Sequence, residues 1–205
     1  MCPTVPAPYN GERGINVNET ASKFLAEDDF WKIILVSLDG TDSVGLVQDR
    51  QQQLLERELQ HLSYDEFTGF LGHFWEKFWA AYRNDLWALA YVVMGGCSDD
   101  CFTDFRTWLV TRGKSVFVEA LRSPDSLCDE FNKIPAGDIP LWEYNFEQQF
   151  DVRFGDDQAS KIYEQYNFGL PELRDPENQW SSDDEATMKK QCPIVFEKHW
   201  GKWRF

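Results

Sequence analysis

Residues 62–82, LSYDEFTGFLGHFWEKFWAAY, constrain the fold of this chain more than any other segment. The aromatic and leucine side chains recur at steps of three and four, so they share one face of a helix. Ser63 and Glu66 form the serine-x-x-glutamate pattern of a capping box, which marks where that helix begins. The next segment, NDLWALAYVVM over residues 84–94, is apolar almost all round. A helix of this kind must be covered on most sides, so the two segments predict a helical bundle.

Helical patterns on both sides of this centre predict a mainly α, single-domain multi-helix bundle. We expect about seven helices within residues 27–205, including an aromatic C-terminal tail, behind a loose, proline-containing arm at residues 1–26. The segment near 140–155 fits both strand alternation and helical spacing, and we expect it to be irregular or partly extended. Further along, Ser182 and Glu185 predict a second capping box.

The charge of the chain limits the classes of function. With 20 Lys and Arg against 35 Asp and Glu, the net charge is −15. This balance argues against nucleic-acid binding, which needs stripes of Lys and Arg to neutralise phosphates, and against docking on an anionic membrane. It suits solubility, which is the commoner reason for such a charge, and it also suits a basic protein partner. The start of the chain lacks the basic and apolar segments of a signal peptide, and residues 87–94 are too short a run to cross a bilayer, so we expect a cytoplasmic protein.

A second notable stretch is MGGCSDDCFTDFRTW, residues 94–108. Gly95 and its neighbour end the apolar helix, where a left-handed residue is usually needed. Ser98 is a favourable N-cap for the next helix, and Asp99 and Asp100 fall in its first turn, where acidic residues are favoured. A structural role therefore explains most of this stretch.

The same stretch also supplies candidate catalytic residues. Asp99 and Asp100, with Asp104 within two turns of the same helix start, could hold a divalent cation through their carboxylate oxygens, and Asp99 and Asp100 are also candidate acids. Arg106 is a candidate anion clamp, although we favour a buried salt bridge to Asp99 or Asp85. His73 is a candidate general base, with a glutamate three residues further along its helix, or else a hydrogen-bonded residue at the edge of the core.

The five cysteines stand at irregular spacing, which is typical of reduced thiols. Cys97 and Cys101 would need two further ligands to bind zinc, and Cys128 and His73 are the conceivable ones; packed thiols need none. Cys97 also precedes a helix start, where the pKa of a thiol can be depressed. The chain carries no complete metal motif, phosphate loop, serine elbow or dinucleotide fingerprint, and it indicates no particular cofactor.

Several motifs together resemble a known family. Residues 82–127 contain an Asp-Leu-Trp helix, Gly-Gly-Cys-Ser-Asp-Asp, Phe-Arg-x-Trp-Leu and a Pro-Asp-Ser-Leu turn. This combination resembles the bacterial domain-of-unknown-function family 4240 (DUF4240), and the resemblance spans residues 30–200. Cys101 stands where a small residue such as glycine is expected. The resemblance implies a single helical domain in an intracellular protein, and it brings no activity and no catalytic residues.

Two functional hypotheses remain open. The first is a non-enzymatic protein-interaction module, of an inhibitor or immunity type, whose acidic surface binds a basic protein partner. The second is an enzyme of unfamiliar type with a polar cleft around residues 95–106, with or without a metal. The charge and the lack of familiar catalytic motifs favour the first. The oligomeric state is left open.

Overall fold

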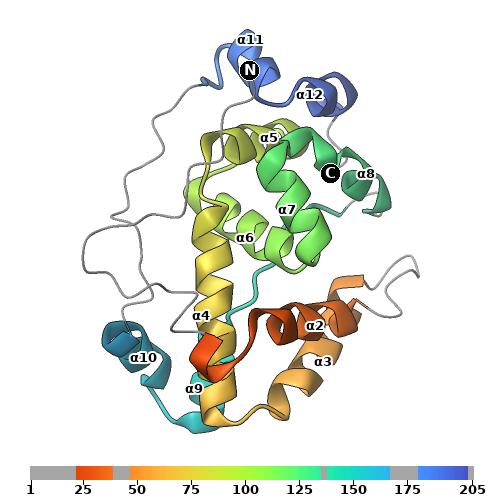
Figure 1. Ribbon diagram of the computed structural model, residues 1–205. Coiled ribbons are helices and arrows are strands. Elements are labelled where there is room, and N and C mark those ends of the chain that lie inside the picture. The colour runs from red at the N-terminus through yellow and green to blue at the C-terminus, as the bar shows by residue number, and fades with distance from the viewer. Residues whose placement is uncertain (1–21, 39–46, 135–137, 167–179, 203–205) are drawn as a thin grey trace.

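The computed structural model describes residues 22–38, 47–134, 138–166 and 180–202 (Figure 1). Within these ranges the chain forms eleven α-helices and one 3-10 helix and no strand, which confirms the predicted mainly α class. The elements are α2 (Glu27–Ser37), α3 (Val47–Gln60), α4 (Tyr64–Ala80), α5 (Asn84–Met94), α6 (Asp99–Val110), α7 (Lys114–Arg122), η1 (Pro124–Leu127), α8 (Cys128–Lys133), α9 (Phe146–Phe154), α10 (Gln158–Tyr166), α11 (Glu185–Gln191) and α12 (Pro193–His199). The expected number of about seven helices was too low: α9 lies in the segment with the ambiguous pattern, and the seven-residue α12 was not expected.

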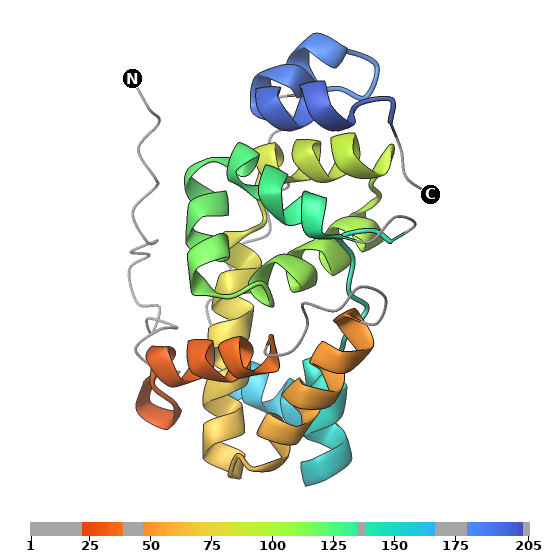
Figure 2. The same cartoon turned by 90° about the vertical axis from the view of Figure 1, so that its right-hand side faces the viewer.

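Helix α4 runs through the centre of the lower part of the molecule, up to the helices α5 to α8 above it (Figures 1 and 2). It begins as predicted: the Ser63 hydroxyl accepts a hydrogen bond from the backbone N–H of Glu66, and the Glu66 carboxylate accepts one from the backbone N–H of Ser63 at 2.7 Å. Helices α2, α3, α9 and α10 lie around one half of α4, and α5 to α8 gather around the other. Helices α11 and α12 pack on α5 at the far end.

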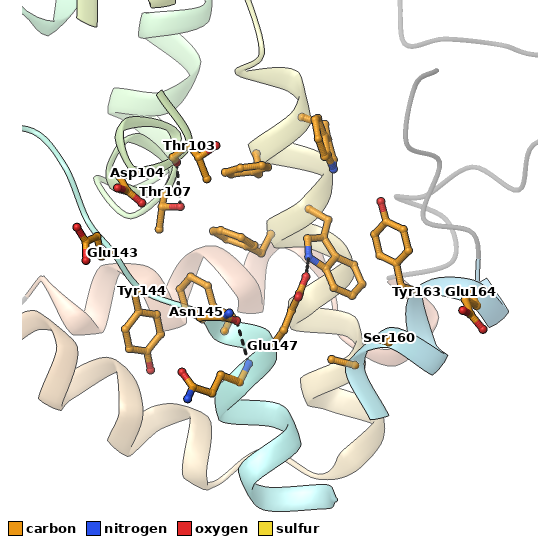
Figure 3. A pocket seen from close by; sticks show the side chains of 17 residues that line it. Thr103, Asp104, Thr107, Glu143, Tyr144, Asn145, Glu147, Ser160, Tyr163 and Glu164 are labelled. Atoms are coloured by element: carbon orange, nitrogen blue, oxygen red, sulfur yellow. Dashed lines mark hydrogen bonds between the residues drawn. The ribbon is translucent and has the colours of Figure 1, made fainter. Parts of the chain in front are cut away.

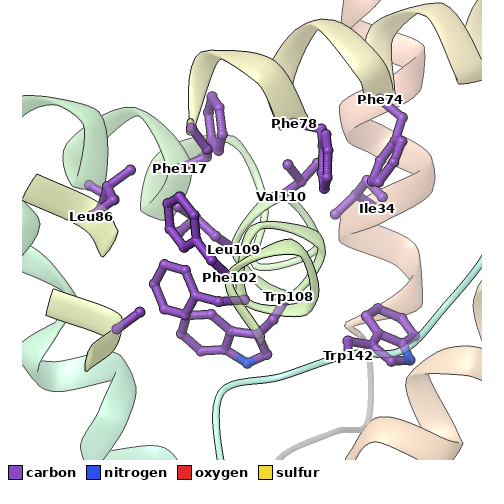
Figure 4. Packing of buried hydrophobic residues seen from close by; sticks show 14 of the residues in the cluster. Ile34, Phe74, Phe78, Leu86, Phe102, Trp108, Leu109, Val110, Phe117 and Trp142 are labelled. Carbon is purple, nitrogen blue, oxygen red and sulfur yellow. The ribbon is translucent and has the colours of Figure 1, made fainter. Parts of the chain in front are cut away.

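The core is rich in aromatic side chains, and much of it surrounds α6. Figure 4 shows side chains of α2, α4, α5 and α7 directed at this helix. Phe102 and Phe105 of α6 are fully buried, and the Phe102 ring stacks on Trp87 with the ring centres 4.9 Å apart. The apolar helix α5 is buried on most sides, as its sequence predicted.

The turn between α5 and α6 is also as predicted. Gly95 ends α5 in the left-handed region at φ 73°, and its N–H donates to the Tyr91 carbonyl oxygen at 2.9 Å. The Ser98 hydroxyl then caps α6 by accepting from the Cys101 N–H at 3.3 Å.

The segment near 140–155 divides into two parts. Residues 138–145 are irregular, and this part is attached to α6 because the Trp142 N–H donates to the Asp104 carbonyl oxygen at 3.1 Å. The Asn145 side chain then caps α9 by accepting from the Gln148 N–H at 2.9 Å. Of the two patterns that this segment fitted, the helical one applies from Phe146 onward.

Both ends of the described chain differ in detail from the expectation. Residues 1–21 of the expected arm and residues 203–205 of the tail lie outside the described ranges, while Leu25 is buried in the core. The second capping box was wrong at its first residue, because Asp184 rather than Ser182 caps α11, accepting from the Ala186 N–H at 3.1 Å. None of the helices in the described ranges is long and apolar enough to cross a membrane.

Candidate functional site

A pocket of about 750 Å³ lies between α4, α6, the segment leading into α9, and α10 (Figure 3). This volume is within the usual range for small-ligand sites. One of its walls is aromatic and comes from α4, where Phe74, Trp75, Phe78 and Trp79 occupy one side of the helix. The opposite wall is polar, with threonine hydroxyls from α6 and an amide from residue 145.

Contacts across the pocket hold α10 and α9 against α4. The Trp75 indole N–H donates to the Glu147 carboxylate at 2.9 Å, and the Trp75 ring meets Tyr163 of α10 edge to face at 4.9 Å. Phe74 packs on Phe146 with ring centres 4.5 Å apart. Burial, and to a smaller extent Glu147, raises the pKa of Tyr163 to about 12, so its hydroxyl stays protonated at neutral pH.

Four carboxylates line the pocket, from Asp104, Glu143, Glu147 and Glu164, and the described residues lining it include no Lys, Arg or His. Asp104 and Glu143 lie at one end in Figure 3, and Glu164 lies at the opposite end. Burial raises the pKa of Asp104, and the charges of Glu143 and Asp100 raise it further. This end of the pocket therefore carries negative charge that the lining residues do not neutralise.

None of the four catalytic candidates from the sequence lines this pocket. His73 is fully buried, where its Nε2 lies 2.8 Å from the Leu25 carbonyl oxygen. Because a carbonyl only accepts, Nε2 carries the proton, and His73 joins α4 to the start of α2. Its Nδ1 lies 3.8 Å from the Glu76 carboxylate. The sequence left two roles open for His73, a general base and a hydrogen-bonded residue at the edge of the core. The contacts in the structure are those of the hydrogen-bonded residue.

Asp99 and Asp100 are exposed in the first turn of α6, as the helix pattern predicted. In the described part of the chain, no three His, Cys, Asp or Glu side chains come close enough together to hold a metal ion. The position of Asp99 and Asp100 agrees with the structural role of acidic residues at a helix start. Their candidacy as acids or metal ligands stays a prediction.

Arg106 is only 4% exposed, and its guanidinium lies over aromatic rings. The predicted salt bridge is wrong: Asp85 pairs with Arg83, whose Nε donates at 3.0 Å, and Asp99 affects Arg106 only through its charge. The guanidinium carbon instead lies 3.9 Å from the centre of the Phe78 ring. The other alternative, an anion clamp, stays a prediction.

Cys97 does not have the activated thiol that its position before a helix suggested. Burial raises its pKa, and the neighbouring Cys101 and Asp99 raise it further. Its sulfur lies 3.7 Å from the Ser98 carbonyl oxygen. At neutral pH this thiol is protonated and is a weak nucleophile.

Comparison with known protein families gives a match over most of the described chain. The family described as "Protein of unknown function (DUF4240)" matches residues 25–157. The chain belongs to this family. The match begins slightly before the resemblance inferred from the sequence and ends well before residue 200. No curated protein and no solved structure matches the chain.

The DUF4240 match covers three walls of the pocket and stops short of the fourth. Helices α4, α6 and α9 lie within residues 25–157, whereas α10, with Tyr163 and Glu164, follows them. The sequence reasoning identified Asp104 as one of a group of acids near a helix start, but not as a pocket residue. Two signals pointed to the pocket: tryptophans beside the buried stripe of α4, and alternating aromatic and polar residues over 142–147.

Proposed function

We propose that this DUF4240 protein is a non-enzymatic interaction module, as an inhibitor or immunity-type protein would be, and that its pocket receives a cationic side chain of a basic protein partner. One observation carries the proposal. Four carboxylates and an aromatic wall line a pocket whose described lining contains no cationic residue.

The chemistry of the pocket suits a cation. Aromatic faces attract positive charge through their quadrupole, and carboxylates accept charge-assisted hydrogen bonds from ammonium or guanidinium groups. The methylene stem of a lysine or arginine packs well on aromatic side chains such as Phe74 and Trp79. The net charge of −15 would also steer a basic partner toward the molecule.

A peptide titration followed by NMR tests the proposal. Tetralysine amide is added to ¹⁵N-labelled protein at low and high salt, and the indole N–H signals of Trp75 and Trp79 are followed, assigned through their phenylalanine variants. We expect these two signals to shift with saturation, and we expect salt to weaken binding. Tetraglutamate serves as the peptide control.

Two double variants locate the site. Asp104→Asn with Glu143→Gln removes two charges from the pocket, and Asp99→Asn with Asp100→Asn removes two from the same helix outside it. We expect the first to weaken binding about tenfold or more, because each charge-assisted hydrogen bond is worth roughly 1.5–3 kcal/mol. Equal weakening by both would mean that the peptide only follows net charge, and the pocket assignment would be abandoned.

A further inference from the structure

The carboxylates of the pocket are divided between its two ends. Asp104 and Glu143 lie at the α6 end, and Glu164 lies on α10 at the other. Glu147, between them, already accepts the hydrogen bond from Trp75. A ligand with one positive charge can therefore neutralise only one end of the pocket.

The α6 end has the acceptors that a primary ammonium group needs. Such a group has three N–H donors. The carboxylates of Asp104 and Glu143 lie within electrostatic reach of each other, and the hydroxyls of Thr103 and Thr107 line the same end. A quaternary ammonium has no N–H bond to donate to the carboxylates of Asp104 and Glu143, so these groups favour an amine that keeps its N–H bonds.

The wall between the two ends is apolar. Phe74, Trp75 and Phe78 of α4 line it, and the Tyr163 ring faces Trp75 from α10. Aromatic faces of this kind bury methylene groups and also stabilise a nearby positive charge. A chain of methylenes therefore fits the middle of the pocket better than a polar linker does.

We propose that the pocket binds a linear alkyl diammonium ion, a diaminoalkane or polyamine, with one ammonium held by Asp104 and Glu143 and the other beside Glu164. This goes beyond the proposed function: it uses the same pocket but commits to a small-molecule ligand with two charges on one chain. It also makes α10, which lies outside the family match, the element that selects for the second charge.

Calorimetric titration at constant ionic strength tests the proposal on the full chain. The probes are a series of α,ω-diaminoalkanes of increasing length, each compared with the monoamine of equal carbon number. We expect the best diamine to bind about tenfold or more tightly than its monoamine, since it makes a second charge-assisted contact. The length that binds best reports the separation of the two ends.

Glu164→Gln is the decisive variant. We expect it to reduce diamine affinity to the level of the monoamine and to leave monoamine affinity unchanged. The Asp104→Asn, Glu143→Gln double variant is expected to weaken both ligands strongly, and the Asp99→Asn, Asp100→Asn control to weaken them far less, because Asp100 acts on this end only through its charge. Circular dichroism of each variant verifies that it is folded. No preference for diamines, or equal loss of both ligands in Glu164→Gln, would overturn the two-ended site.

The tetralysine titration separates this inference from the proposed function. Binding of tetralysine without a preference for diamines would overturn the diammonium site and leave the basic partner in place. Binding of diamines without tetralysine would support the small-molecule site and count against the basic partner. Absence of both would overturn both proposals.

Discussion

Arg106 is a buried cation surrounded by rings, and its replacement tests that description. The guanidinium carbon lies 3.9 Å from the centre of the Phe78 ring and 4.7 Å from that of Tyr82. Nη2 donates to the Thr103 hydroxyl at 3.1 Å, while Nη1 is buried with no hydrogen-bond partner in the described part of the chain. No carboxylate of the described residues forms an ion pair with it, so its charge is stabilised mainly by the aromatic faces.

The opposing free energies are of similar size. Burial lowers the Arg106 pKa to about 10. This is more than two pH units below the ordinary value and corresponds to roughly 3 kcal/mol of lost charge solvation. The buried cation–π contacts return about 2 kcal/mol, and the loss at the buried Nη1, which has no hydrogen-bond partner among the described residues, is already part of this solvation cost. The positive charge therefore contributes little net stability.

Two substitutions separate the charge from the shape. Arg106→Met removes the charge and keeps an unbranched apolar stem, so we expect a free energy of unfolding within about 1 kcal/mol of the wild type. Arg106→Lys keeps the charge but loses the planar group that stacks on the rings, so we expect a loss of about 2–3 kcal/mol. The expected order of stability is therefore Met above Lys.

Urea denaturation followed by circular dichroism measures both variants. The slope of the free energy of unfolding against urea concentration should be the same in both variants as in the wild type, so that the unfolding midpoints report stability directly. The opposite order, with Lys close to wild type and Met losing about 2 kcal/mol or more, would refute the reasoning. It would mean that the charge itself is needed, as an anion clamp or salt bridge requires.

Four further predictions follow from single contacts. Ser63→Ala removes the cap of α4 and should lower the free energy of unfolding in urea by about 1 kcal/mol; no change would show that the cap is not used. Burial and the charge of Glu143 raise the pKa of the Asp104 carboxyl group, so the folded state binds the carboxyl proton more tightly than the unfolded state does. The free energy of unfolding therefore falls as the pH rises from about 4 through the raised pKa. The Tm of Asp104→Asn should therefore exceed that of the wild type by more at neutral pH than near pH 3. An equal difference in Tm at the two pH values would show that the pKa of Asp104 is not raised in the folded state. Asp125 accepts hydrogen bonds from two backbone N–H groups at the start of α12 at 3.0 and 2.9 Å, so Asp125→Ala should speed hydrogen exchange in residues 193–199; unchanged exchange there would exclude this role. Cys97, whose pKa burial raises, should react with iodoacetamide at about pH 8 more slowly than glutathione does, as measured by peptide mapping, whereas faster alkylation would indicate an activated thiol.

Local patterns in the sequence predicted the parts of the fold that depend on near neighbours. The period of α4, its capping box at Ser63, the left-handed Gly95 and the Ser98 cap all involve residues within a few positions of each other. Such features follow from backbone geometry and the reach of one side chain. Of the short helices, α9 fell in a segment whose pattern was ambiguous and α12 was not expected, since two turns contain few positions to show a period.

The pocket depends instead on contacts between residues far apart in the chain. Asp104 and Glu143 are brought together by the hydrogen bond from the Trp142 N–H to α6, and Trp75 meets Glu147 and Tyr163 only because α9 and α10 fold back onto α4. Both depend on how helices pack, which spacing along one helix does not specify.

The amino-acid sequence by itself determined that the chain is a helical member of its family, where its longest helices begin and end, and that its charge is strongly negative. Tertiary structure alone decided which charges are neutralised. It placed Arg106 among rings instead of beside Asp99, and it left the Asp104 end of the pocket without a cation among the residues that line it. The physical reason is that burial and pairing set the free energy of a charge, and both are properties of the packed molecule.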